Sequence, residues 1–235
     1  FTNRPLLNTW YPQALANSLA GTDLNLLGSD KSDMAASFNS DIDDSVCLGN
    51  TDWWYGVGGT TPPNAISFYE TALHELAHGL GFLTFVNLST GEKFMSRNDH
   101  FMRLLKDLDS GEIWPGMTSA ERQASAVNTT DLVWIGEKAK AAAAGLLTAG
   151  LRGSGDIRMY APNPLEPGSS VSHWDIALSP DELMEPLATP TSISSITTAA
   201  FEDMGWNIIS GGPGDPGDTT PPNIVPFIFP LLLDE

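Results

Sequence analysis

The stretch HELAHGLGF, residues 74–82, decides more about this chain than any other part of its sequence. His74 and His78 are four positions apart, so on an α-helix their imidazoles lie on the same face. Two imidazoles in that arrangement can bind one metal ion, and the carboxylate of Glu75 lies beside them, free to act as a base. The stretch therefore predicts a metal-binding helix equipped for hydrolysis.

The neighbouring residues favour a helix that begins just after Ser67. Ser67 and Glu70 have the S-x-x-E spacing of a capping box, which satisfies two backbone N–H groups at a helix start. Gly81 provides a residue that tolerates left-handed geometry near the end. Apolar residues at helical spacing predict one buried face. They are Tyr69, Leu73, Leu76, Ala77 and Leu80.

Three further blocks follow this motif at a distance. Between Gly81 and His173 lie 91 residues, and His173 stands in the tetrapeptide SHWD at 172–175. Met184 comes eleven residues after His173, in the segment DELMEP at 181–186. The stretch ITTAAFEDMGWN at 196–207 has a helical pattern that stops at Gly205.

In this order and spacing, the four blocks resemble the leishmanolysin-type metalloproteases of the metzincin class and their bacterial secreted relatives. The matching segments cluster at 67–86 and 171–207. The resemblance implies that His74, His78 and His173 bind zinc. It also implies that Glu75 is the catalytic base and that Met184 forms the Met-turn beneath the metal. The implied function is a zinc-dependent endopeptidase, secreted or extracytoplasmic, with a protein or peptide substrate.

The resemblance also implies an α+β fold of the metzincin-like zincin type. A small twisted sheet and the active-site helix are expected in an N-terminal lobe at 1–90. A mostly helical C-terminal lobe at 91–210 is expected to hold the insertion, the third histidine and the Met-turn. Residues 211–221 have the glycine and proline content of a linker, and 222–235 form an apolar tail. Leu187 and its neighbours are expected to shape the substrate pocket.

The chain departs from the metzincin pattern at two points. In most metzincins the third ligand is a histidine or aspartate three residues after the glycine, but that position holds Thr84. The protozoan family members are rich in cysteine, whereas this chain has the single Cys47 and so no internal disulfide. We expect Cys47 to be a buried, unreactive thiol, with a thiolate cap on zinc as the alternative.

Other interpretations stay open. The third ligand could be Glu182 or Glu185, as in the branch of HExxH enzymes that uses a downstream glutamate. The chain could also be a non-catalytic binding module on a protease fold, or a calcium-dependent adhesion or structural domain. His100 is expected at the surface and outside the site. Asp175 is expected to be an exposed loop carboxylate, with orientation of a ligand imidazole as the alternative.

The charge balance limits the classes of partner that this chain is expected to bind. The chain has 11 Lys and Arg against 29 Asp and Glu, a formal net charge of −18. This balance argues against nucleic acid and anionic lipid as partners, and no apolar run approaches the ~20 residues of a membrane span. The sequence does not indicate an oligomeric state. Calcium is a second cofactor to consider beside zinc. Its candidate ligands are Asp41, Asp43 and Asp44, and the run Asp23, Asn25, Asp30 and Asp33.

The remaining elements are expected from local patterns. They are a helix at 12–20 ending at Gly21, strands at 34–38 and 53–57, a capping box of Thr118 and Glu121, an alanine-rich helix within 137–150, and a helix at 194–204.

Overall fold

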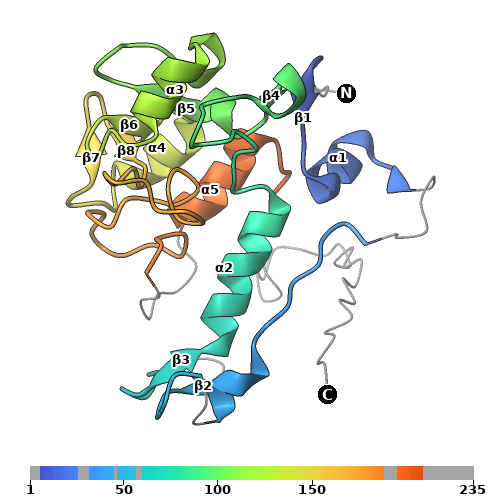
Figure 1. Cartoon of the computed structure of the whole chain (residues 1–235), viewed down its shortest axis with the longest axis vertical. Helices are drawn as coiled ribbons and strands as arrows, with labels where there is room; N and C mark the ends of the chain where they lie inside the picture. Colours follow the sequence, from blue (N-terminus) through green and yellow to red (C-terminus); the bar gives the residue numbers. More distant parts are fainter. Residues whose placement is uncertain (1–5, 26–31, 45–46, 57–59, 188–194, 209–235) are drawn as a thin grey trace, which may run out of the picture.

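The computed structural model describes residues 6–25, 32–44, 47–56, 60–187 and 195–208 (Figure 1). The expected linker at 211–221 and tail at 222–235 lie outside these ranges. Within them the chain mixes helices with small sheets, which agrees with an α+β class. The helices are α1 (Gln13–Ala20), α2 (Phe68–Leu80), α3 (Ser119–Ser125), α4 (Glu137–Ala143) and α5 (Ser195–Met204). Single 3-10 turns are η2 (Ser40–Asp43), η3 (Phe94–Ser96), η4 (Met102–Leu104) and η5 (Trp114–Gly116).

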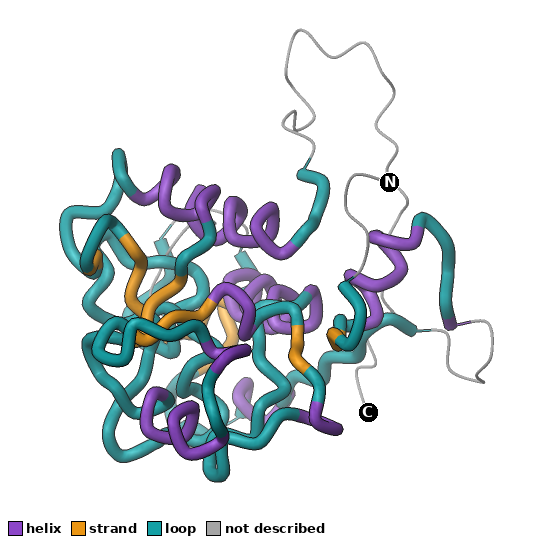
Figure 2. Tube along the Cα trace, turned by 90° about the horizontal axis from the view of Figure 1, so that it is seen from above, coloured by secondary structure: helices purple, strands orange, loops and turns teal. Residues whose placement is uncertain are grey.

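The strands are short and form three small sheets. They are β1 (Thr9–Trp10), β2 (Asp52–Trp54), β3 (Ala65–Ser67), β4 (Asn98–Asp99), β5 (Leu105–Asp107), β6 (Leu132–Trp134), β7 (Leu151–Arg152) and β8 (Asp156–Arg158). β1 pairs with β4 and β2 with β3, both in parallel, and the four-stranded antiparallel sheet has the order β5-β6-β8-β7. Figure 2 shows how much of the chain between these elements is loop.

The four-stranded sheet corrects one prediction. Residues 91–210 were expected to be mostly helical, but strands from 105 to 158 form the largest sheet of the described chain. Its centre is the fully buried strand β6, which pairs Trp134 with both Leu105 and Ile157. Strands of two or three residues are too short to show the alternation that identifies a strand in sequence. The lobe boundary at 90 stays a prediction, and one cluster of buried side chains contains residues from both sides of it.

An aromatic core lies where the two halves of the chain meet. Phe82 contacts Phe101 with ring centroids 5.1 Å apart and Trp174 at 4.9 Å, while Trp134 contacts Trp174 at 5.7 Å. All four side chains are fully buried. Each ring of this kind contributes on the order of 2–3 kcal/mol by burial. Because Phe82 ends the HELAHGLGF motif and Trp174 follows His173, this core fixes both segments in one place.

Helix α2 runs from the β2–β3 pair at one end to the main body at the other (Figure 1). Ser67 Oγ accepts from the Glu70 N–H, which is the Ser67 half of the predicted capping box. The helix ends at Gly81, whose φ of 124° lies in the region that favours glycine. Of the predicted buried stripe, only Ala77 is buried, and Tyr69 is 44% exposed. Leu73, Leu76 and Leu80 are half-buried, so the predicted stripe is covered only in part.

Other local predictions have mixed outcomes. The helix at 12–20 is confirmed as α1, with Gly21 in left-handed geometry at its end. The capping box of Thr118 and Glu121 is confirmed with both of its bonds. The alanine-rich helix is shorter than its sequence pattern, and the 53–57 strand appears as β2. The strand at 34–38 is wrong, because these residues make no strand pairing. Cys47 is exposed rather than buried.

Candidate metal centre

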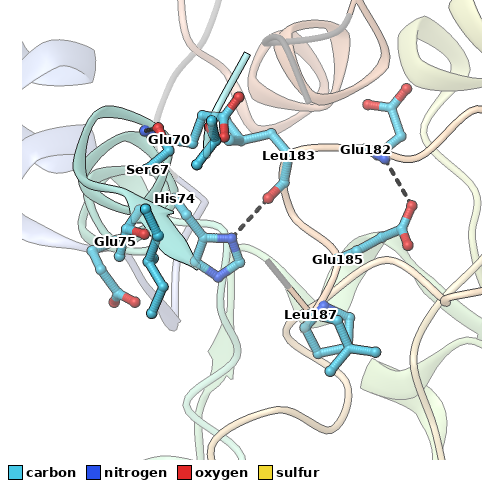
Figure 3. Close-up of a pocket in the computed structure, with 13 residues that line it drawn as sticks. Ser67, Glu70, His74, Glu75, Glu182, Leu183, Glu185 and Leu187 are labelled. Carbon is cyan, nitrogen blue, oxygen red and sulfur yellow. Dashed lines mark hydrogen bonds between the residues drawn. The ribbon is translucent and has the colours of Figure 1, made fainter. Parts of the chain in front are cut away.

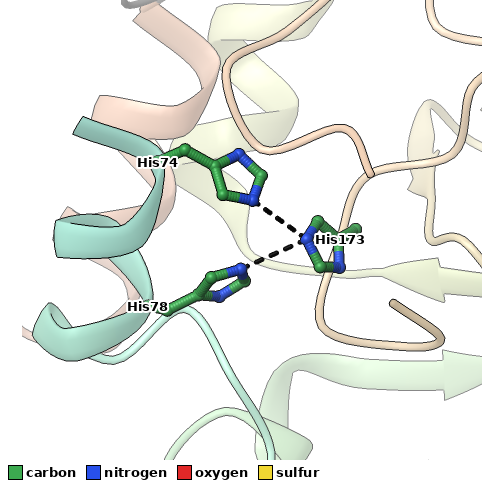
Figure 4. A group of neighbouring side chains, drawn as sticks. All are labelled: His74, His78 and His173. Carbon is green, nitrogen blue, oxygen red and sulfur yellow. Dashed lines mark hydrogen bonds between the residues drawn. The ribbon is translucent and has the colours of Figure 1, made fainter. Parts of the chain in front are cut away.

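Three imidazoles converge beside α2 (Figure 4). His74 and His78 project from one face of the helix, one turn apart, and His173 reaches them from a loop after β8. His173 Nε2 lies 3.0 Å from His74 Nε2 and 3.1 Å from His78 Nε2. His173 is 4% exposed, and the other two rings are half-buried. The structure therefore brings together the three histidines that were predicted from positions 74, 78 and 173.

The opposite nitrogen of each ring is bonded to a backbone carbonyl. His74 Nδ1 lies 2.7 Å from the Leu183 oxygen, His78 Nδ1 lies 2.8 Å from the Phe82 oxygen, and His173 Nδ1 lies 2.7 Å from the Ser169 oxygen. Because a carbonyl only accepts hydrogen bonds, each Nδ1 carries the proton and donates it. In a neutral imidazole the Nε2 then has only a lone pair. Three lone pairs therefore face one another at the centre of the group.

Burial keeps the rings of His173 and His78 neutral. The pKa of His173 is lowered to about 3, mainly by burial and also by the nearby His78 and His74, against the effect of the Ser169 carbonyl. Burial also lowers the pKa of His78, although the carbonyl of Phe82 partly offsets this. Neutral imidazole is the form that binds a metal ion. At neutral pH His78 and His173 therefore supply unprotonated nitrogen donors.

The turn around Met184 supports two of the histidines. The Glu185 N–H donates to the Glu182 carbonyl at 3.1 Å, which closes a tight turn with Met184 fully buried inside it. The Met184 carbonyl accepts from the Trp174 N–H at 2.8 Å, and the preceding carbonyl is the partner of His74. This turn is thus bonded both to the helix histidine and to the segment that carries His173.

Thr84 also has a structural role at the centre. Its Oγ1 donates to Asp99 Oδ2 at 2.8 Å, and its N–H donates to Ser172 Oγ at 3.3 Å. Asp99 is 1% exposed and accepts a further bond from the Phe85 N–H at 2.8 Å. The residue that stands where most metzincins have their third ligand therefore ties the turn after α2 to the loop of His173.

A pocket of about 220 Å³ opens beside His74 and Glu75 (Figure 3). Glu75 is exposed on α2, so its carboxylate is available to solvent and to a ligand. One wall comes from β3 and the first turns of α2, and the other comes from residues 182–187. Leu187 lines the pocket, and its role in shaping the substrate pocket stays a prediction.

Two side chains differ from their predicted environment. His100 is outside the three-histidine group, as expected, but it is 4% exposed and its Nε2–H donates to the Gly81 carbonyl at 2.7 Å. Asp175 is 3% exposed and accepts from Arg158 at 3.0 Å, so it is neither a loop carboxylate in solvent nor the partner of a ligand imidazole. Both are structural groups of the interior.

Two of the predicted calcium ligands accept hydrogen bonds from other protein groups in the described part of the chain. Asp43 accepts from the Trp53 N–H at 2.8 Å and from the Tyr55 hydroxyl at 2.5 Å. Asp33 accepts from the side-chain amide of Asn17 at 2.7 Å, and Asp30 lies outside the described residues. Within the described ranges, only the three histidines form a cluster suited to a metal ion. Calcium binding stays a prediction.

Sequence reasoning missed the carbonyl partners of the histidines and the burial of Glu182 and Glu185 beside the pocket. The carbonyls could not have been found, because every residue has one and only the fold selects among them. The glutamates had a signal, since they flank Met184 in a segment of mixed acidic and apolar residues.

No family model matches this chain, and no curated protein or solved structure was found to be similar to it. In the described part of the chain, no helix has the length and apolar character to cross a membrane.

Proposed function

We propose that this protein is a secreted zinc-dependent endopeptidase of the metzincin type. The observation that carries the proposal is the convergence of three unprotonated Nε2 atoms from His74, His78 and His173. Lone pairs this close repel one another, and a shared cation removes the repulsion. The resemblance of the four sequence blocks to leishmanolysin-type proteases supports the same function.

The donor set fits zinc. Zinc sites commonly use three protein ligands when they are catalytic, and neutral imidazole is among the preferred ones. Zn–N bonds of about 2.0–2.1 Å in a tetrahedral arrangement separate the nitrogens by about 3.3 Å. The observed separations of 3.0 and 3.1 Å are close to this value. The carbonyl partners on Nδ1 also match the supporting bonds that metal-binding histidines generally make.

The chemistry follows from this donor set and Glu75. Zinc held by three histidines supplies Lewis acidity toward a water molecule and a peptide carbonyl. Glu75 takes a proton from the attacking water as general base and passes it to the departing amine as general acid. The exposed position of Glu75 at the pocket leaves room for substrate beside its carboxylate.

The geometry favours His173 over a glutamate as the third ligand. Glu182 Oε2 accepts from the Thr197 hydroxyl at 3.3 Å, and Glu185 Oε1 accepts from the Glu182 N–H at 2.7 Å. In the part of the chain that is described, neither carboxylate belongs to the histidine group. A binding module without activity is the second candidate, and the presence of Glu75 beside the histidines argues against it.

Replacement of Glu75 tests this function. We expect the purified protein to cleave a denatured protein substrate, to lose this activity with phenanthroline, and to regain it with zinc. The variant Glu75→Gln should keep its zinc and lose about 10²–10⁴-fold in kcat/KM. The matched control Glu137→Gln, at an exposed acid on α4, should cleave as the wild type does.

Two results would contradict the proposal in different ways. Full turnover by Glu75→Gln would remove the assigned base. A wild-type protein that binds zinc and cleaves no peptide would favour the binding module instead.

A further inference from the structure

The pocket beside His74 is lined by several acidic residues. Glu70 and Glu75 reach it from α2, and Glu182 and Glu185 reach it from the turn around Met184. Among the described residues that line it, none is Lys or Arg. The pocket next to the proposed metal centre is therefore lined by four acidic residues and by no basic one.

These carboxylates have no cationic partner within the described chain. The Lys and Arg residues that form ion pairs there do so with other acids. Glu182 and Glu185 are 1% and 4% exposed, and Glu182 Oε1 has no hydrogen-bond partner. The charged groups that act on Glu185 are Asp181 and Asp175, both acidic. Within the described chain, no basic side chain therefore offsets the charge of these two acids when they ionise.

An uncompensated buried carboxylate is costly, because burial removes water without supplying a counter-charge. Burial raises the pKa of Glu182 and of Glu185 to about 7 for this reason. A cation brought by a ligand would supply the missing charge.

The rest of the pocket suits a long side chain with a charged end. Ile66, Leu183 and Leu187 supply apolar surface along the walls. Lysine and arginine bury an apolar stem while their charged end contacts polar groups. A volume of about 220 Å³ is below the ~300–1,000 Å³ of drug-sized ligand sites, so it fits one side chain.

We infer that this pocket binds the lysine or arginine side chain of the substrate residue next to the cleaved bond, with Glu185 as the main specificity-determining residue. The inference rests on the proposed peptidase function. Glu185 is chosen because it lines the pocket from the turn that also holds Met184, whereas Glu75 is assigned to the reaction itself.

Matched peptides test the inference. One peptide series carries a single lysine, moved stepwise along an otherwise neutral sequence. The second series carries norleucine, which has a similar stem and no charge. Cleavage sites are identified by mass spectrometry, and kcat/KM is measured for each pair. We expect a lysine-to-norleucine ratio of about tenfold or more at one position adjacent to the cleaved bond, and a ratio near one elsewhere.

Variants then assign the preference to the pocket. In Glu185→Gln the lysine-to-norleucine ratio of kcat/KM should fall about tenfold. A general loss of activity lowers both values equally and so leaves this ratio unchanged. In the control Glu137→Gln, at an exposed acid on α4 outside the pocket lining, the ratio should change by less than about twofold, because exposed charges are screened by solvent.

The outcomes separate the two proposals. Cleavage of norleucine peptides as fast as lysine peptides overturns the inference and leaves the peptidase function standing. An equal fall in ratio for Glu137→Gln also overturns it, since the preference then comes from general surface charge. No cleavage of either series contradicts the peptidase function. For that case, a Glu75→Gln protein that binds lysine peptides more tightly than norleucine peptides, by fluorescence anisotropy, would still support the pocket.

Discussion

Removal of the metal should lower the thermal stability of this protein, and His173 should be required for the effect. His173 Nε2 lies 3.0 and 3.1 Å from the two helix nitrogens, held there by carbonyl bonds on the opposite side of each ring. A cation that binds only the folded chain stabilises it by RT ln(1 + [L]/Kd). Chelation removes that contribution and leaves the lone pairs facing one another.

The free energy of zinc binding sets how far Tm falls on chelation. With free zinc at 100 to 1,000 times Kd, binding contributes about 2.7–4.1 kcal/mol. For a chain of 235 residues, 1 kcal/mol corresponds to about 2–4 °C in Tm. The wild-type protein should therefore lose about 5–15 °C in Tm on chelation and recover it when zinc is added back.

The assay compares the response of three proteins to chelator by calorimetry, together with zinc content by atomic absorption. His173→Ala should bind zinc weakly and show almost no response to chelator, because two ligands hold zinc poorly. His100→Ala is the matched control, since His100 is also 4% exposed and is bonded to Gly81 rather than to the histidine group. This control should have a lower Tm and the full response to chelator. An undiminished response in His173→Ala, with unchanged zinc content, would refute the assignment of the third ligand.

Three further predictions concern the framework around the centre. Burial lowers the pKa of His100 to about 4 from an ordinary 6.5, so between these pH values the unfolded chain takes up a proton that the folded chain does not. His100 should thereby contribute a fall of about 3 kcal/mol in the free energy of unfolding as the pH decreases from 6.5 to 4, and urea titrations of His100→Gln should lack this contribution. Gly81→Ala should destabilise by more than about 1 kcal/mol, since φ is 124° and a Cβ would lie 2.8 Å from His100 Nε2, and an unchanged urea midpoint would contradict this. Asp203 accepts from the N–H groups of Lys138 at 2.9 Å and Ala139 at 3.0 Å, so Asp203→Ala should cost about 1–2 kcal/mol by urea titration while zinc content stays that of wild type.

Local sequence determined the elements whose interactions close within a few residues. The i, i+4 spacing of His74 and His78, the Ser67 cap and Gly81 are sufficient to specify α2 and the face that carries both imidazoles. Thr118 and Glu121 likewise specify the start of α3 through bonds that span three positions. These features are readable because helix hydrogen bonds and caps are formed by near neighbours.

Only the tertiary structure decided the features that join distant segments. The sheet of β5, β6, β7 and β8 depends on pairing between strands of two or three residues, and such pairs have almost no local signature. His100 and Asp175 occur in polar sequence, yet the fold buries both and supplies a carbonyl and an arginine as their partners. Burial depends on what the rest of the chain packs against a residue, which its neighbours in sequence do not reveal.

The proposed metal centre combines both kinds of information. Sequence alone proposed His173 as the partner of the helix pair, from its place among the blocks of a recognised pattern. The fold decided how close the rings lie, because the aromatic core of Phe82 and Trp174 and the carbonyls of Leu183 and Ser169 set their positions. The charge of the adjacent pocket was also decided by the fold, since it brings α2 against the turn around Met184. A motif specifies which donor atoms are present. Their convergence on one point requires packing contacts from the whole chain.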